Sequence, residues 1–93
     1  IDLRTIRPWD RDLVLSSVRR TGRCLVVHED NLTCGFGAEI AAVVADEAFA
    51  WLDAPVARVA TFDCPVPYHP RLTAAVVPTR ETIRARIEDL LAF

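Results

Sequence analysis

The sequence has little of several residues that often mark a specialised protein. It contains no lysine and no methionine, and only three glycines among its 93 residues. Its apolar runs are a few residues long, far below the roughly 20 residues that cross a membrane, so no membrane span is predicted. Eleven arginines stand against 13 acidic residues, which gives a net charge of −2. This near-neutral balance argues against nucleic acid or an anionic membrane as a partner, and we expect neither.

Cysteine is also scarce. Cys24, Cys34 and Cys64 cannot all pair with one another, and no two of them form a C-x-x-C unit. A zinc site built from these thiols and His28 or His69 would need closely spaced ligand pairs, which the sequence lacks. We therefore predict no metal site, and we expect free thiols in a reducing compartment, the cytoplasm.

What the sequence does contain is typical of one globular domain. Hydrophobic residues make up 52% of the chain and charged residues 26%, a composition that argues against intrinsic disorder. A chain of this length hides only roughly 60–65% of its unfolded surface, so we predict a single domain over residues 1–93 with a small core. The chain opens with Ile1, and we expect it to be a fragment of a larger subunit.

Strand-like and helix-like segments alternate along the chain. Asp10 and Thr79 stand where helix N-caps are expected, and Gly22 is well placed to end the first helix in the left-handed conformation. Four prolines within residues 63–78 predict an irregular segment, with a short extended piece at residues 74–77. The predicted elements are strands at residues 1–6, 24–28 and 56–61, and helices at residues 10–22, 35–52 and 79–93.

The alternation predicts the fold class. Strands that alternate with helices indicate an α/β fold, in which helices cover a parallel sheet and the crossovers are right-handed. Within the first helix, we expect Leu13, Val14 and Val18 to form the buried stripe. Three strands are few for a free-standing sheet, so we expect the sheet to continue into sequence outside the chain, or a partner to complete it.

No motif in the chain amounts to a complete catalytic or cofactor site. The glycines of Gly35-Phe36-Gly37 open a helix after a strand, but Ile40 stands where a dinucleotide-binding motif needs its third glycine. We expect these glycines to allow close backbone packing instead. His28 and Cys34 lack an identified orienting partner for a nucleophile and its base, and we predict no catalytic residue.

The arginines have simple explanations as helix-end and helix-surface charges. Arg19, Arg20 and Arg23 surround the end of the first helix, where cations complement the helix dipole. Arg84 and Glu88 are spaced to form an i,i+4 ion pair on the last helix.

Five motifs follow one another along nearly the whole chain. They are IDLRTIRPWD at residues 1–10, TGRCLVVHE at 21–29, TCGFGAEI at 33–40, LDAPVARV at 52–59 and PVPY at 65–68. In this order they resemble the C-terminal domain of the beta subunit in the thiamine-diphosphate-dependent component of 2-oxo acid dehydrogenase complexes. The branched-chain type is favoured over the pyruvate type.

The resemblance implies a fold, a reaction and a set of partners. The fold is a three-layer α/β/α sandwich of the transketolase C-terminal type with a mostly parallel sheet. The parent enzyme converts a 2-oxo acid to an acyl-lipoyl product and CO₂, with thiamine diphosphate and Mg²⁺ bound outside this segment. Its implied partners are a second beta subunit, an alpha subunit or fused alpha part, and the lipoyl acyltransferase component.

Within that family, this segment would serve assembly and docking. Two alternatives stay open: the matching domain of a transketolase or deoxyxylulose-phosphate synthase, and a free-standing interaction module. The residues expected at a subunit interface are Gly35, Phe36, Gly37 and Glu39. The residues expected to dock the acyltransferase are Arg84, Asp89 and Phe93.

Overall fold

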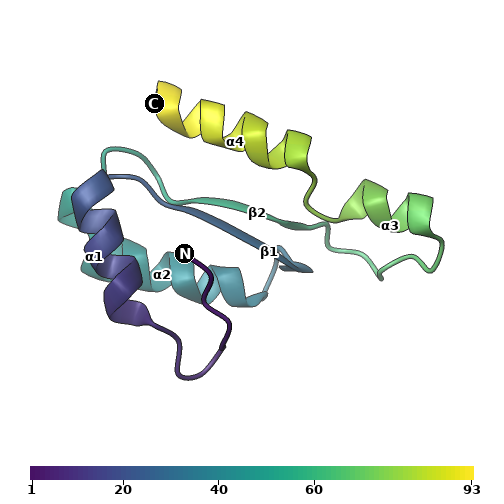
Figure 1. Ribbon diagram of the computed structural model, residues 1–93, viewed down its shortest axis with the longest axis horizontal. Helices are drawn as coiled ribbons and strands as arrows, with labels where there is room; N and C mark the ends of the chain where they lie inside the picture. Colours follow the sequence, from purple (N-terminus) through teal and green to yellow (C-terminus); the bar gives the residue numbers. More distant parts are fainter.

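Two parallel strands lie between layers of helices in the computed structural model, which describes residues 1–93 (Figure 1). Their Cα partners place Leu25 beside Ala57 and Val27 beside Val59. Helices α1 and α2 lie on one side of the strands and α4 on the other, so the three-layer arrangement and the parallel sheet are confirmed. The elements in chain order are α1 (Arg11–Thr21), β1 (Leu25–Asn31), α2 (Phe36–Glu47), the 3-10 turn η1 (Phe49–Trp51), β2 (Ala57–Thr61), α3 (Pro70–Val76) and α4 (Arg80–Ala92).

The predicted helix caps form as expected. The Asp10 carboxylate accepts a hydrogen bond from the backbone N–H of Leu13 at 3.1 Å, and Gly22 ends α1 with φ +69°. Thr79 caps α4 and exchanges hydrogen bonds with Thr82, so both ends of this capping box are satisfied.

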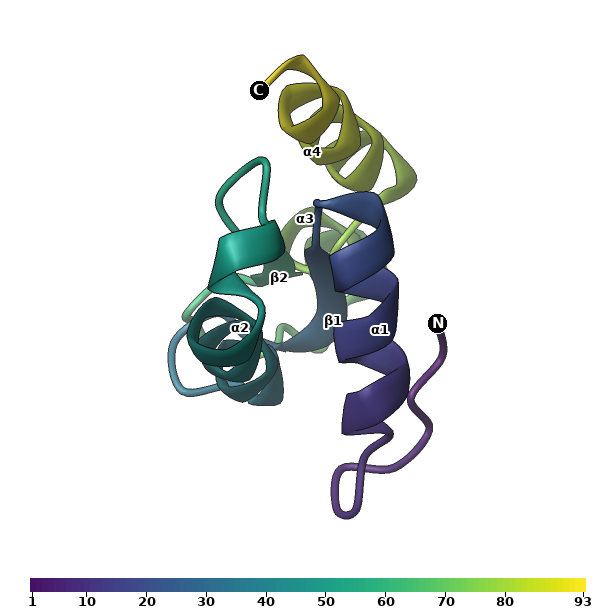
Figure 2. The same ribbon diagram turned by 90° about the vertical axis from the view of Figure 1, so that its left-hand side faces the viewer.

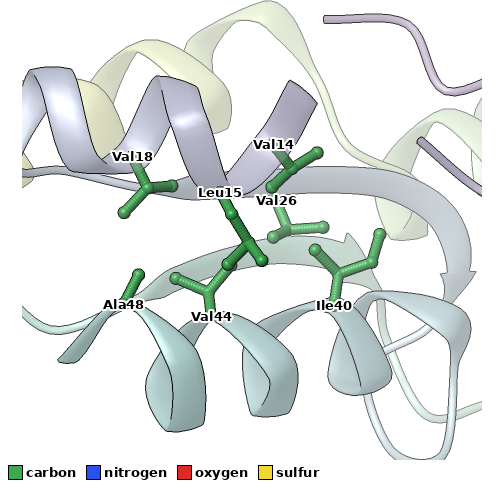
Figure 3. Packing of buried hydrophobic residues seen from close by; sticks show 7 residues of the cluster. All are labelled: Val14, Leu15, Val18, Val26, Ile40, Val44 and Ala48. Atoms are coloured by element: carbon green, nitrogen blue, oxygen red, sulfur yellow. The ribbon is translucent and has the colours of Figure 1, made fainter. Parts of the chain in front are cut away.

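The core is small and lies between α1, α2 and β1. Figure 3 shows side chains from the two helices and from β1 pointing toward one another. Leu15 is buried, whereas Leu13 is 47% exposed, so the predicted stripe of α1 was wrong by one residue and right at Val14 and Val18. The buried cluster consists of Val14, Leu15, Val18, Val26, Ile40, Val44 and Ala48.

The predicted strand at residues 1–6 is wrong. The segment is irregular, Thr5 N–H bonds back to the Leu3 carbonyl at 2.6 Å, and Arg4 has a positive φ of 60°. A strand needs a neighbour for its backbone groups, and the sheet consists of β1 and β2 alone. The N-terminal segment therefore bends back on itself, and Ile1 and Ile6 stay 70% and 69% exposed.

Two other predicted segments differ from the structure. The long helix ends at Glu47 and continues only as the turn η1, instead of running to residue 52. The piece predicted to be extended at residues 74–77 lies largely in α3, because Pro70 starts that helix and His69 caps it. The His69 Nδ1 atom accepts a hydrogen bond from the Arg71 N–H at 3.2 Å.

Most large apolar side chains outside the core are exposed. Only 13 of the 93 residues are buried, and neither α3 nor α4 contains a buried residue. Seen from the side in Figure 2, α4 stands apart from α1 and α2, beyond the strands. Much of the apolar surface is thus left for contacts that the chain does not make with itself.

Candidate functional site

The carboxyl ends of the two strands are joined by a polar contact between loops. This edge of an open α/β sheet is where ligands usually bind. After β2, the Asp63 carboxylate accepts hydrogen bonds from the Thr33 backbone N–H at 2.9 Å and from the Thr33 hydroxyl at 2.6 Å. These bonds hold the pKa of the Asp63 carboxyl below its ordinary value. The Asp63 carboxylate already has partners, so it fixes a loop and is not poised as an acid or base.

His28 lies in β1 beneath the start of α2. A side chain at Gly35 would meet the Asn31 carbonyl oxygen and the His28 ring, and a side chain at Gly37 would meet the same imidazole. The two glycines therefore allow the helix start to approach β1, as predicted. Both ring nitrogens of His28 are buried without a hydrogen-bond partner in the chain.

Cys34 and His28 do not form a nucleophile and base pair. Cys34 is exposed at the turn before α2, and no hydrogen bond joins its thiol to the imidazole. Cys24 is half-buried, and burial raises the pKa of its thiol, which lowers its reactivity. No group of three or more His, Cys, Asp or Glu side chains is arranged to hold a metal ion.

The residues predicted for a subunit interface do not share one exposed surface. Gly35 and Gly37 are buried within the chain. Phe36 is half-buried and meets Trp9 edge-on, with ring centroids 6.4 Å apart. Glu39 alone among them is exposed in the first full turn of α2.

Residues 25–28 of β1 line a cavity of about 500 Å³. The N-terminal segment, residues 1–6, also lines this cavity, as do His28 and Phe36. Since β1 has β2 on one side only, its other edge carries backbone groups without a strand partner. That the sheet continues here, or that a partner completes it, stays a prediction.

The residues predicted for docking lie on α4 but on different sides of it. Ile83 and Leu90 are the half-buried residues of the helix and turn toward the sheet. At about 100° per residue, Arg84 and Asp89 lie on opposite flanks of that inner face. Phe93 follows Asp89 by four residues and is 74% exposed. Asp89 and Phe93 can thus act together at the end of α4, whereas Arg84 is separate.

The start of α2 does not fit a diphosphate and its magnesium ion. A helix start that binds a phosphate needs free backbone N–H groups. At α2, the Phe36 N–H already faces the Asp30 carboxylate at 3.4 Å, and that negative charge would repel a phosphate. No carboxylate cluster is available for Mg²⁺ either.

The fold and these surfaces can be compared with known proteins. The family model for the transketolase C-terminal domain matches residues 1–83. The chain belongs to this family. A transketolase C-terminal domain accounts for the parallel strands and for the helices on both faces.

The relatives of this transketolase C-terminal domain confirm the resemblance stated above. The 2-oxoisovalerate dehydrogenase beta subunit of Chaetomium thermophilum is 55% identical over 69 residues, which are 72% of this chain and 15% of that protein. The 2-oxoisovalerate dehydrogenase beta subunit 2 of Arabidopsis thaliana is 54% identical over 67 residues, which are 72% of this chain and 19% of that protein. The pyruvate dehydrogenase E1 component subunit beta of Rickettsia conorii is 42% identical over all 93 residues, 28% of that protein. The chain thus spans between 15% and 28% of the length of these relatives.

No helix in the structure has the length and apolar character needed to cross a membrane.

Proposed function

We propose that the chain is the assembly and docking domain of a 2-oxo acid dehydrogenase beta subunit. The observation that carries the proposal is that the relatives described above, matched over 72% to 100% of this chain, are beta subunits of such dehydrogenases. The dehydrogenase reading is therefore favoured over a transketolase or a free-standing module.

The parent enzyme is proposed to convert a branched-chain 2-oxo acid, or pyruvate, to an acyl-lipoyl product and CO₂. The branched-chain substrate is favoured because identity reaches 55% over 69 residues with a 2-oxoisovalerate dehydrogenase beta subunit, against 48% over 79 residues with the pyruvate dehydrogenase E1 beta subunit of Rickettsia bellii. Thiamine diphosphate would be held by other parts of the enzyme, because the start of α2 does not fit it. The three free thiols suit a reducing compartment, and we propose the cytoplasm.

The end of α4 supports the docking role. Asp89 lies in the last turn of α4 and Phe93 directly follows the helix, and the side chain of Asp89 is 70% exposed. Aromatic side chains such as the exposed Phe93 are enriched at protein interfaces. Arg84, with 77% of its side chain exposed, would contact the acyltransferase only if that partner reaches around the helix.

The start of α2 supports the subunit contact in a narrower form. We propose that Glu39 and the edge of Phe36 face a second beta subunit or the alpha subunit, while Gly35 and Gly37 shape this surface from within.

The catalytic part of the proposal is tested by direct assay. Thiamine diphosphate, Mg²⁺ and a branched-chain 2-oxo acid, added to the 93-residue chain, should release no CO₂. Turnover by this chain alone would contradict a role limited to assembly and docking.

The docking part is tested with the complete protein that carries this chain. Mixed with a purified lipoyl acyltransferase core, the complete protein should co-sediment with the core. If the two sediment separately at micromolar concentrations, the docking role is wrong.

A further inference from the structure

Helix α4 is loosely attached to the rest of the chain. None of its residues is buried, and Ile87 and Leu91 are 42% and 65% exposed. Its ion pairs, such as Arg84–Glu88 at 2.8 Å, lie within the helix and join it to nothing else. Apart from its contact with β2 and its own N-cap, one hydrogen bond joins the helix to the rest of the chain. That bond comes from Arg23.

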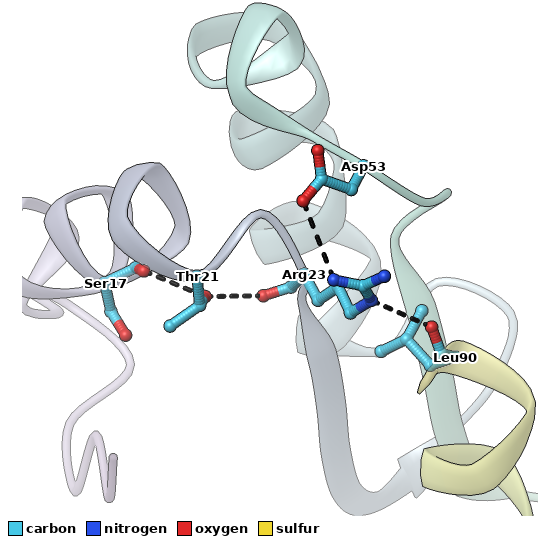
Figure 4. A network of polar contacts seen from close by, with 5 residues as sticks. All are labelled: Ser17, Thr21, Arg23, Asp53 and Leu90. Atoms are coloured by element: carbon cyan, nitrogen blue, oxygen red, sulfur yellow. Dashed lines mark hydrogen bonds and ion pairs between the residues drawn. The ribbon is translucent and has the colours of Figure 1, made fainter. Parts of the chain in front are cut away.

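The Arg23 guanidinium joins two distant parts of the chain (Figure 4). Its Nε donates to the carbonyl oxygen of Leu90 at 3.0 Å, across a separation of 67 residues. Its Nη1 lies 3.6 Å from the Asp53 carboxylate. The Arg23 side chain is only 31% exposed, so water competes weakly for these bonds, and bonds to a charged donor are stronger than neutral ones.

The accepting carbonyl lies in the last turn of α4. The Leu90 oxygen takes this hydrogen bond from outside the helix, because its donor is the Arg23 side chain. The positive charge of Arg23 there complements the negative end of the α4 dipole. The expectation that Arg23 serves the end of α1 is wrong in this respect.

The backbone around Arg23 is held firmly. Gly22 ends α1 with φ +69°, and its carbonyl accepts the Asp53 N–H at 2.7 Å. The Thr21 hydroxyl lies 2.9 Å from the Ser17 carbonyl oxygen and 3.2 Å from that of Arg23. The guanidinium thus extends from a fixed junction between α1 and β1.

We propose that Arg23 is a positioning residue that fixes the last turn of α4 and, through it, the orientation of Asp89 and Phe93. This inference rests on the proposed docking role of α4. Arg23 touches no docking partner itself; it determines whether the docking side chains are presented in one arrangement or many.

The test compares variants of the complete protein by two independent measurements. Hydrogen exchange of the amides in residues 89–92 reports how firmly the helix end is held. Affinity for the lipoyl acyltransferase core reports docking. Arg20→Ala is the matched control, because Arg20 is exposed at the end of α1 and forms no hydrogen bond or ion pair.

Arg23→Ala should speed exchange in the last turn of α4 by about 10- to 100-fold, since one charge-assisted bond is lost. It should weaken acyltransferase binding as well, whereas Arg20→Ala should change neither. Arg23→Lys keeps the positive charge but lacks the planar guanidinium group. Its amides in the last turn of α4 should therefore exchange more slowly than those of Arg23→Ala and faster than those of the wild type. If Arg23→Ala reduces folding, Arg23→Lys still provides a folded variant with intermediate exchange.

The outcomes separate this inference from the proposed function. Unchanged exchange in Arg23→Ala overturns the role of Arg23, whatever happens to binding. Faster exchange with unchanged binding also overturns it as a positioning role. If Asp89→Asn loses acyltransferase binding while its amides exchange at the wild-type rate, the docking role is supported independently of Arg23. If Asp89→Asn still binds the acyltransferase, the result counts against the docking role and not against the role of Arg23.

Discussion

At the scale of single residues, the stability of the chain depends on a few side chains. Nine hydrophobic residues are buried, and each Val, Leu or Ile among them contributes about 1.5–3 kcal/mol by leaving water. Ile40 and Leu13 illustrate the difference that burial makes. Ile40 lies within the cluster at 5% exposure, whereas Leu13 is 47% exposed on α1.

Ile40→Ala should lower the free energy of unfolding by about 2–5 kcal/mol, because it leaves a cavity between α1 and α2. Leu13→Ala, a matched aliphatic truncation on a helix surface, should cost well under half as much. Urea unfolding of the two variants checks this. Equal losses would mean that the cluster is not the core of the molecule.

The Asp63–Thr33 contact has a defined pH dependence. Its hydrogen bonds lower the pKa of Asp63 in the folded chain, so the contact is fully stabilising above the ordinary carboxyl pKa of about 3.9. The stabilisation is lost as the pH falls below that value and through the lower pKa of the folded state. An NMR titration of the Asp63 carboxyl carbon should give a midpoint below 3.9, moving upward in Thr33→Ala. A midpoint at or above 3.9 would show that the loops are not joined in this way.

Residue-scale features were predictable from the sequence where their partners are local. Asp10, Gly22 and Thr79 act within one helical turn, and their roles were predicted correctly. The partner of Arg23 lies 67 residues away, and no local pattern indicates it. The burial of Leu15 in place of Leu13 was missed because the two leucines lie on opposite flanks of Val14, about 200° apart around the helix, and packing against α2 decides which flank is buried.

At the scale of elements, the β1–α2–β2 unit was predictable and the two ends of the chain were less so. An apolar run such as that of β1 carries its own signal. The alternation at residues 1–6 is equally strand-like, yet a strand forms only when a neighbour accepts its backbone bonds. In α3 the prolines were interpreted as breakers, although Pro70 stands at the first helical position, where it is favourable.

Helix α4 should depend strongly on its N-terminal cap, because it has no buried residue to hold it. Thr79→Ala removes the hydroxyl that accepts the Thr82 N–H, and it should cost about 1 kcal/mol of helix stability. Faster hydrogen exchange in residues 83–86 would show the loss. Thr73→Ala, in α3, is the control that should leave α4 unchanged, and a helix that is unaffected by Thr79→Ala would show that its cap is unimportant.

At the scale of the whole molecule, the exposed apolar surface is the dominant feature. Phe49, Tyr68 and Phe93 are 75%, 104% and 74% exposed, and β1 has one unpaired edge. A monomer that leaves so much apolar surface in water is expected to associate. A folded domain with this much exposed apolar surface is suited to contacts with other subunits.

The complete protein should therefore sediment as a dimer or a larger assembly. Glu39→Arg should shift it toward smaller species, because it reverses a charge at the proposed subunit contact. Asp46→Arg makes the same charge change at an exposed position of α2 outside that contact, and it should sediment as the wild type does. A strict monomer at high concentration would count against the subunit interface.

This domain is proposed to dock an acyltransferase through α4. Measuring the Kd of the complete protein for the lipoyl acyltransferase core tests that proposal most directly. The double variant Asp89→Asn, Phe93→Ala should weaken binding by about tenfold or more, the loss expected for an important aromatic contact with its charged neighbour. Arg20→Ala should bind as tightly as the wild type. An unchanged Kd in the double variant would place docking elsewhere and contradict a docking role for α4.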